Sequence, residues 1–120
     1  MQYLLLIYLN EADRVVPDTA SREMSNEYRE YTESIAASGN YKGGNGLQST
    51  KTATTVRVRN GKRQTTDSPF AETREQLAGY YLVDAPDLDA AISLAARIPG
   101  ARTGAIEVRP IQEMTAPVPA

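Results

Sequence analysis

Residues 2–9 (Gln-Tyr-Leu-Leu-Leu-Ile-Tyr-Leu) are apolar on both faces of an extended chain. Alternation places two apolar sets on opposite faces: Tyr3, Leu5, Ile7 and Leu9 on one, and Leu4, Leu6 and Tyr8 on the other. A strand of this kind is covered on both sides. In a chain of 120 residues, helices can cover one face, so the other face needs a second layer, which a partner subunit can supply. The stretch therefore predicts a buried strand and hints at a homodimer.

A helix is predicted over residues 19–38. Its apolar stripe consists of Met24, Tyr28, Tyr31 and Ile35, which recur at helical spacing. Thr19 or Ser21 can cap its start, and Gly39 suits the position just after its end. Before this helix, Asp13 and Arg14 lie in a polar segment that is either a solvated loop or the edge of a pocket.

Residues 42–46 (Lys-Gly-Gly-Asn-Gly) have the composition of a phosphate-binding loop but not its spacing. We interpret them as a flexible segment before a short strand at residues 46–48. Residues 52–59 and 62–66 predict a β-hairpin, because Asn60-Gly61 is the preferred pair for a type I′ turn. Its basic residues form either a solvated strand face or a patch for an anionic ligand: Arg57, Arg59, Lys62 and Arg63.

The last third of the chain predicts a strand at residues 77–84, a helix that Asp87 caps, and a strand at residues 105–111. The apolar face expected of this helix consists of Leu88, Ala91, Ile92, Ala95 and Ile98. The order is then β-α-β, an inserted hairpin and β-α-β, which is a ferredoxin-like split βαβ plan of the α+β class with both helices on one face. Two such sheets packed face to face would form a dimeric α+β barrel. We expect one domain over residues 1–112 and a disordered or loosely docked tail over residues 113–120.

The composition excludes several kinds of chemistry. The chain has no His and no Cys, so a zinc site, a Ser-His-Asp triad and a disulfide are not expected, and no residue pattern predicts a metal or a cofactor. The formal net charge of −2 disfavours a nucleic-acid partner. The apolar run at residues 3–9 is far shorter than the roughly 20 residues that span a bilayer. We therefore expect no membrane partner and a cytoplasmic location.

Residues 67–82 concentrate the unusual chemistry of the chain. In a purely structural interpretation, Asp67 accepts a backbone N–H in an Asx-type turn, Phe70 fills the core and Glu72 begins a short helical turn. In a functional interpretation, Asp67 is a catalytic general base or a hydrogen-bond acceptor in a pocket that the dimer bounds. The ligand-binding residues would then be Tyr8, Ser68, Phe70, Glu72 and Tyr80.

The same stretch carries a family resemblance. Residues 54–62 (Thr-Thr-Val-Arg-Val-Arg-Asn-Gly-Lys) and 66–84 (Thr-Asp-Ser-Pro-Phe-Ala-Glu-Thr-Arg-Glu-Gln-Leu-Ala-Gly-Tyr-Tyr-Leu-Val-Asp) resemble the DGPF branch of the YCII-related proteins, whose hallmark reads close to DGPFAETKEQLGGYYL. The resemblance extends to residues 1–8, 85–89, 95–99 and 107–110. It implies a dimeric α+β barrel of ferredoxin-like units.

The resemblance implies less about function. Most members of the family are uncharacterised, and some are encoded with or fused to sigma-factor-type regulators. The wider superfamily is thought to use a His–Asp pair in a cleft, with lyase-type chemistry in one branch. Only the Asp carries over, onto Asp67, and Ser68 stands where the hallmark has Gly. Two hypotheses follow: a small-molecule-binding dimer, as an accessory to regulation, and a lyase or isomerase that uses Asp67 as its base.

Overall fold

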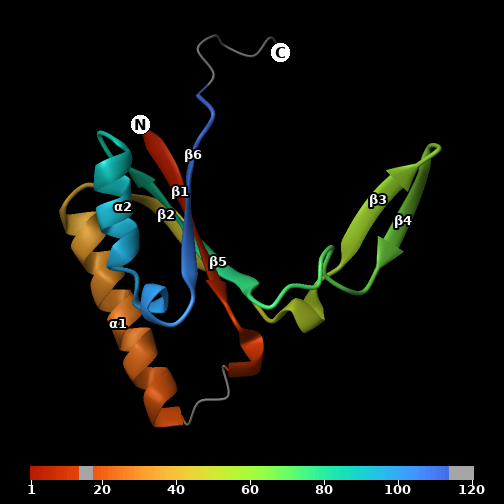
Figure 1. Cartoon of the computed structure of the whole chain (residues 1–120), viewed down its shortest axis with the longest axis horizontal. Helices are drawn as coiled ribbons and strands as arrows, with labels where there is room; N and C mark the ends of the chain where they lie inside the picture. Colours follow the sequence, from red (N-terminus) through yellow and green to blue (C-terminus); the bar gives the residue numbers. More distant parts are fainter. Residues whose placement is uncertain (14–17, 114–120) are drawn as a thin grey trace.

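A four-stranded antiparallel sheet carries two helices on one of its faces (Figure 1). The computed structural model describes residues 1–13 and 18–113, with only the backbone of residues 13 and 18–22. Across the sheet the strands are β2 (Tyr41–Gly46), β5 (Gln76–Asp84), β1 (Gln2–Leu9) and β6 (Ala105–Pro110). The helices are α1 (Asp18–Ala37) and α2 (Leu88–Ala96). The predicted α+β class is confirmed.

β1 lies at the centre of the core, as its sequence predicted. It pairs with β5 on one side and with β6 on the other, and Leu5 lies opposite Tyr81 and Val108. Residues that face the helices are buried on this side of the sheet: Tyr3, Leu5, Ile7, Tyr81 and Val83. Tyr31 and Ile35 of α1 and Ala91 and Leu94 of α2 complete this core.

The ends of both helices follow from local sequence. Gly39 has a φ of 82°, and the hydrogen bonds from Gly39 N to Ala36 O and from Asn40 N to Ile35 O close a Schellman motif. At the start of α2, the Asp87 carboxylate accepts the backbone N–H of Ala90 at 2.8 Å. Both predicted positions are confirmed, whereas the side chains of Thr19 and Ser21 and the whole of Arg14 lie outside the described residues.

Two helical stripes differ from the prediction. Met24 was expected in the core, but its side chain is 38% exposed, and only the C-terminal half of the α1 stripe is buried. In α2 the expected face included Leu88 and Ile92, which are both exposed. Ala91 and Ala95 are buried as expected, together with Leu94, so the face toward the sheet is rotated away from Leu88 and Ile92.

The glycine-rich segment is not a flexible loop. Residues 41–46 form the edge strand β2, which pairs with β5 through an irregularity between Tyr41 and Gly43. The strand expected at residues 46–48 is therefore wrong, and the chain is extended earlier than predicted. Glycine-rich sequences have low strand propensity, but the neighbouring β5 supplies the hydrogen-bonding partner.

The sheet face opposite the helices is apolar and open. Leu4, Leu6, Tyr80 and Leu82 are half-buried, and the register pairs Leu4 with Leu82 and Leu6 with Tyr80. Cross-strand partners share a face, so these four side chains form one contiguous apolar surface. We call it the open face.

A separate two-stranded sheet projects away from the body of the chain (Figure 1). Among the described residues, β3 (Thr55–Arg59) and β4 (Lys62–Thr66) pair only with each other, and the turn has Asn60 at φ 52° and Gly61 at φ 74°. The predicted hairpin and its type of turn residues are confirmed. We call residues 55–70 the arm, since the four residues after β4 belong to its base.

Side-chain contacts hold the segment before the arm to the end of β1 and close the base of the arm. The 3₁₀ helices η1 (Glu11–Asp13) and η2 (Thr50–Thr52) meet there, and the Glu11 carboxylate accepts both the Thr50 backbone N–H, at 2.8 Å, and the Thr50 hydroxyl, at 2.7 Å. Thr55 donates its hydroxyl to the carbonyl oxygen of Ser68 at 2.6 Å.

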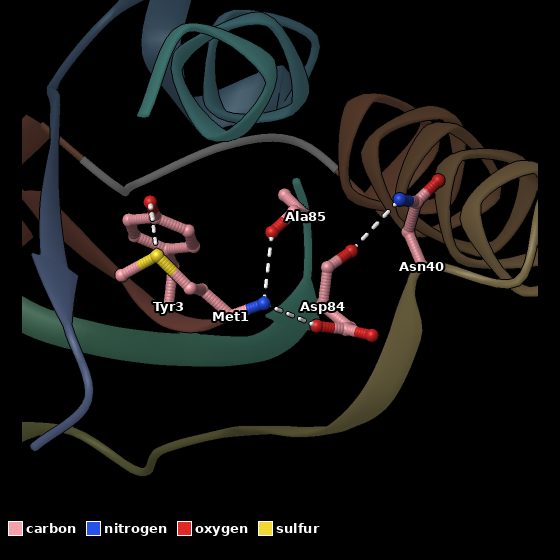
Figure 2. A network of polar contacts seen from close by, with 5 residues as sticks. All are labelled: Met1, Tyr3, Asn40, Asp84 and Ala85. Carbon is pink, nitrogen blue, oxygen red and sulfur yellow. Dashed lines mark hydrogen bonds and ion pairs between the residues drawn. The ribbon is translucent and has the colours of Figure 1, made fainter. Parts of the chain in front are cut away.

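The N-terminal amine lies against the end of β5 (Figure 2). It donates to Asp84 Oδ1 and to the carbonyl oxygen of Ala85, each at 3.1 Å. Asn40 donates to the Asp84 carbonyl at 2.8 Å, so the same turn also contacts the chain that follows α1. These contacts join the start of β1 to the segment between β5 and α2. The tail expected over residues 113–120 lies outside the described residues from residue 114 onward.

Candidate functional site

A cleft of about 1030 Å³ lies between the N-terminal half of α1 and the sheet. Its lining contains nine apolar or aromatic residues, eight polar or charged residues and four glycines. The volume matches the upper end of small-molecule sites, which span roughly 300–1,000 Å³. The lining includes Met24, Tyr28, Thr32, Tyr41, Gly44, Asn45, Leu47, Gly79, Tyr80, Tyr81 and Gly100.

Two hydroxyls form a directed chain in the cleft wall. Thr32 Oγ1 donates to the carbonyl oxygen of Tyr28, one turn earlier in α1, at 2.8 Å, and it lies 2.8 Å from Tyr81 Oη. A threonine hydroxyl has one proton, so Tyr81 is the donor to Thr32 when both bonds are made. The Tyr81 oxygen then has only its lone pairs left, and it can accept a hydrogen bond from a ligand.

Three tyrosine rings pack around this hydroxyl. Tyr81 makes edge-to-face contacts with Tyr31, at 5.2 Å between ring centroids, and with Tyr41, at 6.2 Å. Tyr31 donates its hydroxyl to the Leu94 carbonyl at 2.7 Å, which fixes its ring between the two helices. The rings form a rigid aromatic floor because each is held by a neighbour or by a hydrogen bond.

Burial keeps two of these phenols neutral. It is the main cause that raises the pKa of Tyr81 above its ordinary value, while the hydrogen bond with Thr32 lowers that pKa and Tyr41 raises it. Burial also raises the pKa of Tyr31, Tyr81 adds to the shift, and the Arg97 guanidinium opposes it. Neutral phenols at this position can bind and orient a ligand, but they are poor general bases near neutral pH.

Three glycines in the cleft wall have no room for a side chain. A Cβ atom on Gly44 would lie 2.8 Å from the Tyr80 carbonyl oxygen and 2.9 Å from Tyr81 Cδ1. On Gly79 it would lie 2.8 Å from the carbonyl oxygen of Asn45, and on Gly100 it would lie 2.7 Å from the Tyr28 hydroxyl. A side chain at any of these positions would displace a wall of the cleft.

The charges of the cleft lie at its α1 side. Glu23 is exposed, and Glu27 forms an ion pair with Arg102 of η3 (Pro99–Arg102). The lining therefore contains two carboxylates and one guanidinium among its described residues. This balance, together with the acceptor oxygen of Tyr81, favours a neutral ligand over an anion.

Of the residues predicted for the site, Tyr80 lines the cleft and Tyr8 does not. The Tyr80 hydroxyl accepts an N–H from Asn45 at 2.9 Å, across the β2–β5 pair. Tyr8 is half-buried near the end of β1, beside an irregularity in its pairing with β5. Its neighbour Tyr81 is the more deeply buried of the pair.

Asp67, Ser68, Phe70 and Glu72 lie at the base of the arm, and none of them lines the cleft of its own chain. Asp67, Phe70 and Glu72 are exposed, and Ser68 is half-buried. The Asp67 carboxylate accepts no hydrogen bond from the part of the chain that the structure describes, so the expected Asx turn is absent. Bends replace the helical turn expected at Glu72.

The expectation that Phe70 fills the core is wrong for the single chain, because its side chain is 74% exposed. Its ring instead covers the Arg57 guanidinium, 4.9 Å from the ring centroid. Ser68 needs no glycine-like conformation: among the described residues, Asn60 is the non-glycine residue with a positive φ. The hallmark glycine is therefore not required by the backbone here.

Sequence reasoning missed Thr32, Tyr41 and Tyr81 as members of one site. They come from α1, β2 and β5, and nothing in the local sequence links residues so far apart. The signal that was available is the spacing of Tyr28, Tyr31 and Thr32 on one helix, which places a hydroxyl beside an aromatic stripe. Within residues 1–13 and 18–113, no cluster of His, Asp and Glu could hold a metal ion, and no helix is long and apolar enough to cross a membrane.

The fold and the cleft define a small α+β domain with a site suited to a small molecule. Comparison with known proteins gives its family: the YCII-related domain matches residues 1–115. An uncharacterised protein of Rhizobium meliloti (strain 1021) is 35% identical over 118 residues, which cover 92% of each chain. The chain belongs to the YCII-related family, as the sequence predicted.

Proposed function

We propose that this protein is a small-molecule-binding homodimer, with one cleft in each subunit between α1 and the sheet. The observation that carries the proposal is the cleft itself, with its aromatic floor, its glycine walls and the Tyr81–Thr32 hydroxyl pair. A role as an accessory to regulation and a cytoplasmic location belong to the same proposal.

The dimer forms through the open face. The β-α-β-β-α-β order, with the arm inserted before β5, and the strand order β2-β5-β1-β6 support a ferredoxin-like unit. Two open faces packed against each other would remove Leu4, Leu6, Tyr80 and Leu82 from water and give a dimeric α+β barrel. An exposed apolar surface of this kind is typical of an interface.

The ligand is a neutral aromatic molecule that carries a hydrogen-bond donor. An aromatic ring fits against the Tyr81 and Tyr41 rings, and a donor group can reach the free lone pairs of Tyr81 Oη. A carboxylate in the same place would face these lone pairs, in a cleft whose described lining carries two glutamates and one arginine.

The alternative is a lyase or isomerase in which Asp67 acts as the general base. Asp67 does not line the cleft of its own chain, so this activity requires that a second copy bring the carboxylate to it. The binding function does not have this requirement, and we therefore prefer it.

Glycine amide resonances in ¹H–¹⁵N spectra test the binding proposal directly. We expect 4-hydroxyacetophenone to shift the amides of Gly44, Gly79 and Gly100, which line the cleft, and to leave Gly61 at the arm tip unchanged. 4-Methoxyacetophenone, which has the same ring without the donor, should bind more weakly. If neither compound shifts the cleft glycines, or if Gly61 shifts equally, the proposed site is wrong.

A further inference from the structure

Within residues 1–13 and 18–113, the arm has no extensive packing partner outside itself. There β3 and β4 pair only with each other, and Val56, Val58 and Phe70 have 57%, 61% and 74% of their surfaces exposed. A lone two-stranded ribbon is at best marginally stable in water. The arm also makes the chain unusually extended, with a radius of gyration of 16.8 Å against about 14 Å for a compact domain of this length. Another surface must therefore cover it.

The two faces of the arm differ in character. Val56 and Val58 lie opposite Thr65 and Arg63 and give one face an apolar strip, while Arg57 lies on the other face beneath Phe70. Residues 55–66 contain four cations and no carboxylate. The surface that receives the arm is expected to be apolar at its centre and acidic at its rim.

The mouth of the cleft combines apolar side chains with an acidic one. Met24 and Leu47 line it and are 38% and 43% exposed. Glu23 lies one residue before Met24 and has no ion-pair partner among the described residues, whereas Glu27 is paired with Arg102. Val56, Val58 and Arg63 share one face of the arm. This face matches two apolar side chains beside a glutamate that has no ion-pair partner among the described residues.

The arm and the cleft lie on different sides of the molecule. In Figure 1 the helices lie to the left of the sheet and the arm extends to its right, beyond the open face. The cleft involves α1, on the helical side. The arm therefore points toward the place where the proposed dimer puts the second copy, and away from the cleft of its own chain.

We propose that the arm of one copy packs across the mouth of the cleft in the second copy. Val56 and Val58 contact Met24 and Leu47 of the second copy, and Arg63, which shares the valine face of the arm, faces its Glu23. The base of the arm then brings Asp67 and Phe70 to the ligand, so that each site contains residues from both chains. This inference rests on the proposed homodimer and adds to it the source of the residues that close the site.

Paired cysteines test this contact, because the chain has no cysteine of its own. A variant with Val58→Cys and Met24→Cys is oxidised in a glutathione buffer and examined by non-reducing electrophoresis and intact mass. We expect most of the protein to become a covalent dimer, since a disulfide forms only between Cα atoms less than about 7 Å apart. Each single substitution measures the background.

Two control variants keep the cysteine at residue 58 in the arm and place the second cysteine at another position. Val58→Cys with Glu107→Cys tests the open face, because Glu107 lies opposite Leu6, and Val58→Cys with Ile92→Cys tests the exposed side of α2. We expect both control variants to form no more covalent dimer than the single substitutions do. Preferential cross-linking in either control pair overturns the proposal, and so does a monomer with an internal disulfide between residues 58 and 24.

Light scattering on the same samples separates this inference from the proposed function. A dimeric mass without the 58–24 cross-link overturns the contact between arm and cleft and leaves the dimer intact. A monomeric mass overturns both the arm contact and the dimer, whereas ligand binding is tested independently by the glycine amides.

Discussion

Tyr81 Oη lies 2.8 Å from Thr32 Oγ1, and this pair joins the central strand β5 to α1 at the floor of the cleft. Thr32 in turn donates to the Tyr28 carbonyl, so the pair has a defined direction. The tyrosine proton points to the threonine, and the tyrosine lone pairs point elsewhere. A single threonine hydroxyl thereby sets the hydrogen-bonding character of the site.

Removal of the Tyr81 hydroxyl should weaken ligand binding. We expect Tyr81→Phe to reduce the affinity for 4-hydroxyacetophenone by roughly 3- to 10-fold, the value of one hydrogen bond of about 1 kcal/mol. The affinity for 4-methoxyacetophenone should change little. Isothermal titration calorimetry measures both, and an equal loss for the two compounds would contradict the assigned direction of the Tyr81–Thr32 bond.

The same pair should contribute to stability. Thr32→Val removes the acceptor and leaves the phenol donor of the buried Tyr81 without its partner, which costs about 1–3 kcal/mol of the free energy of unfolding. Thr32→Ser retains the hydroxyl and should cost less. Urea denaturation gives both values; similar losses in the two variants would show that the methyl group, and not the hydroxyl, is responsible.

Alkaline pH should destabilise the fold through Tyr31 and Tyr81. Both have a pKa raised in the folded state, so the unfolded chain loses these protons first. Their contribution is fully present below the unfolded tyrosine pKa of about 10 and is lost as the pH rises above it. Urea unfolding at about pH 8, 10 and 11 measures the decline, and Tyr31→Phe with Tyr81→Phe should make it shallower. If the free energy of unfolding of this double variant falls with pH as steeply as that of the parent, the decline does not come from Tyr31 and Tyr81.

Adjacent glycines of β2 should respond differently to alanine. Gly44→Ala places a Cβ atom 2.8 Å from the Tyr80 carbonyl, whereas nothing lies within 4 Å of a Cβ on Gly43. We expect Gly44→Ala to lower the free energy of unfolding by about 1–3 kcal/mol and Gly43→Ala to change it by less than about 1 kcal/mol. Thermal denaturation compares the two, and equal effects would mean that β2 moves freely against β5.

Ser68→Gly restores the residue of the family hallmark. Because Ser68 does not have a positive φ, glycine relieves no strain and only adds freedom to the unfolded chain. The variant should be up to about 1 kcal/mol less stable than the parent by chemical denaturation. A more stable variant would indicate a strained turn at Ser68.

The sequence predicted the elements that depend on local chemistry. The two apolar faces of residues 2–9 predict a central strand. Asn60-Gly61 predicts the turn of the arm, and Asp87 predicts the start of α2. β2 was missed because its glycines have no strand preference of their own, and its conformation depends on the distant β5.

The site was harder to predict than the fold. Tyr81 and Thr32 are 49 residues apart and meet only when β5 packs against α1. Phe70 was expected inside because large apolar side chains usually are, yet its own chain leaves it exposed. Residues 67–72, which the sequence predicted as the centre of the site, therefore lie away from the cleft of the chain that carries them.

The composition of β2 and β6 has a consequence for aggregation. β2 is an edge strand with Gly43, Gly44, Gly46 and the charged Lys42, and the other edge, β6, ends in Pro110, which has no amide proton to donate. Strands of this kind are poor templates for the addition of a further chain. Sheets of neighbouring molecules are thus discouraged from joining edge to edge into fibres, even though the interior strands are among the most apolar segments of the protein.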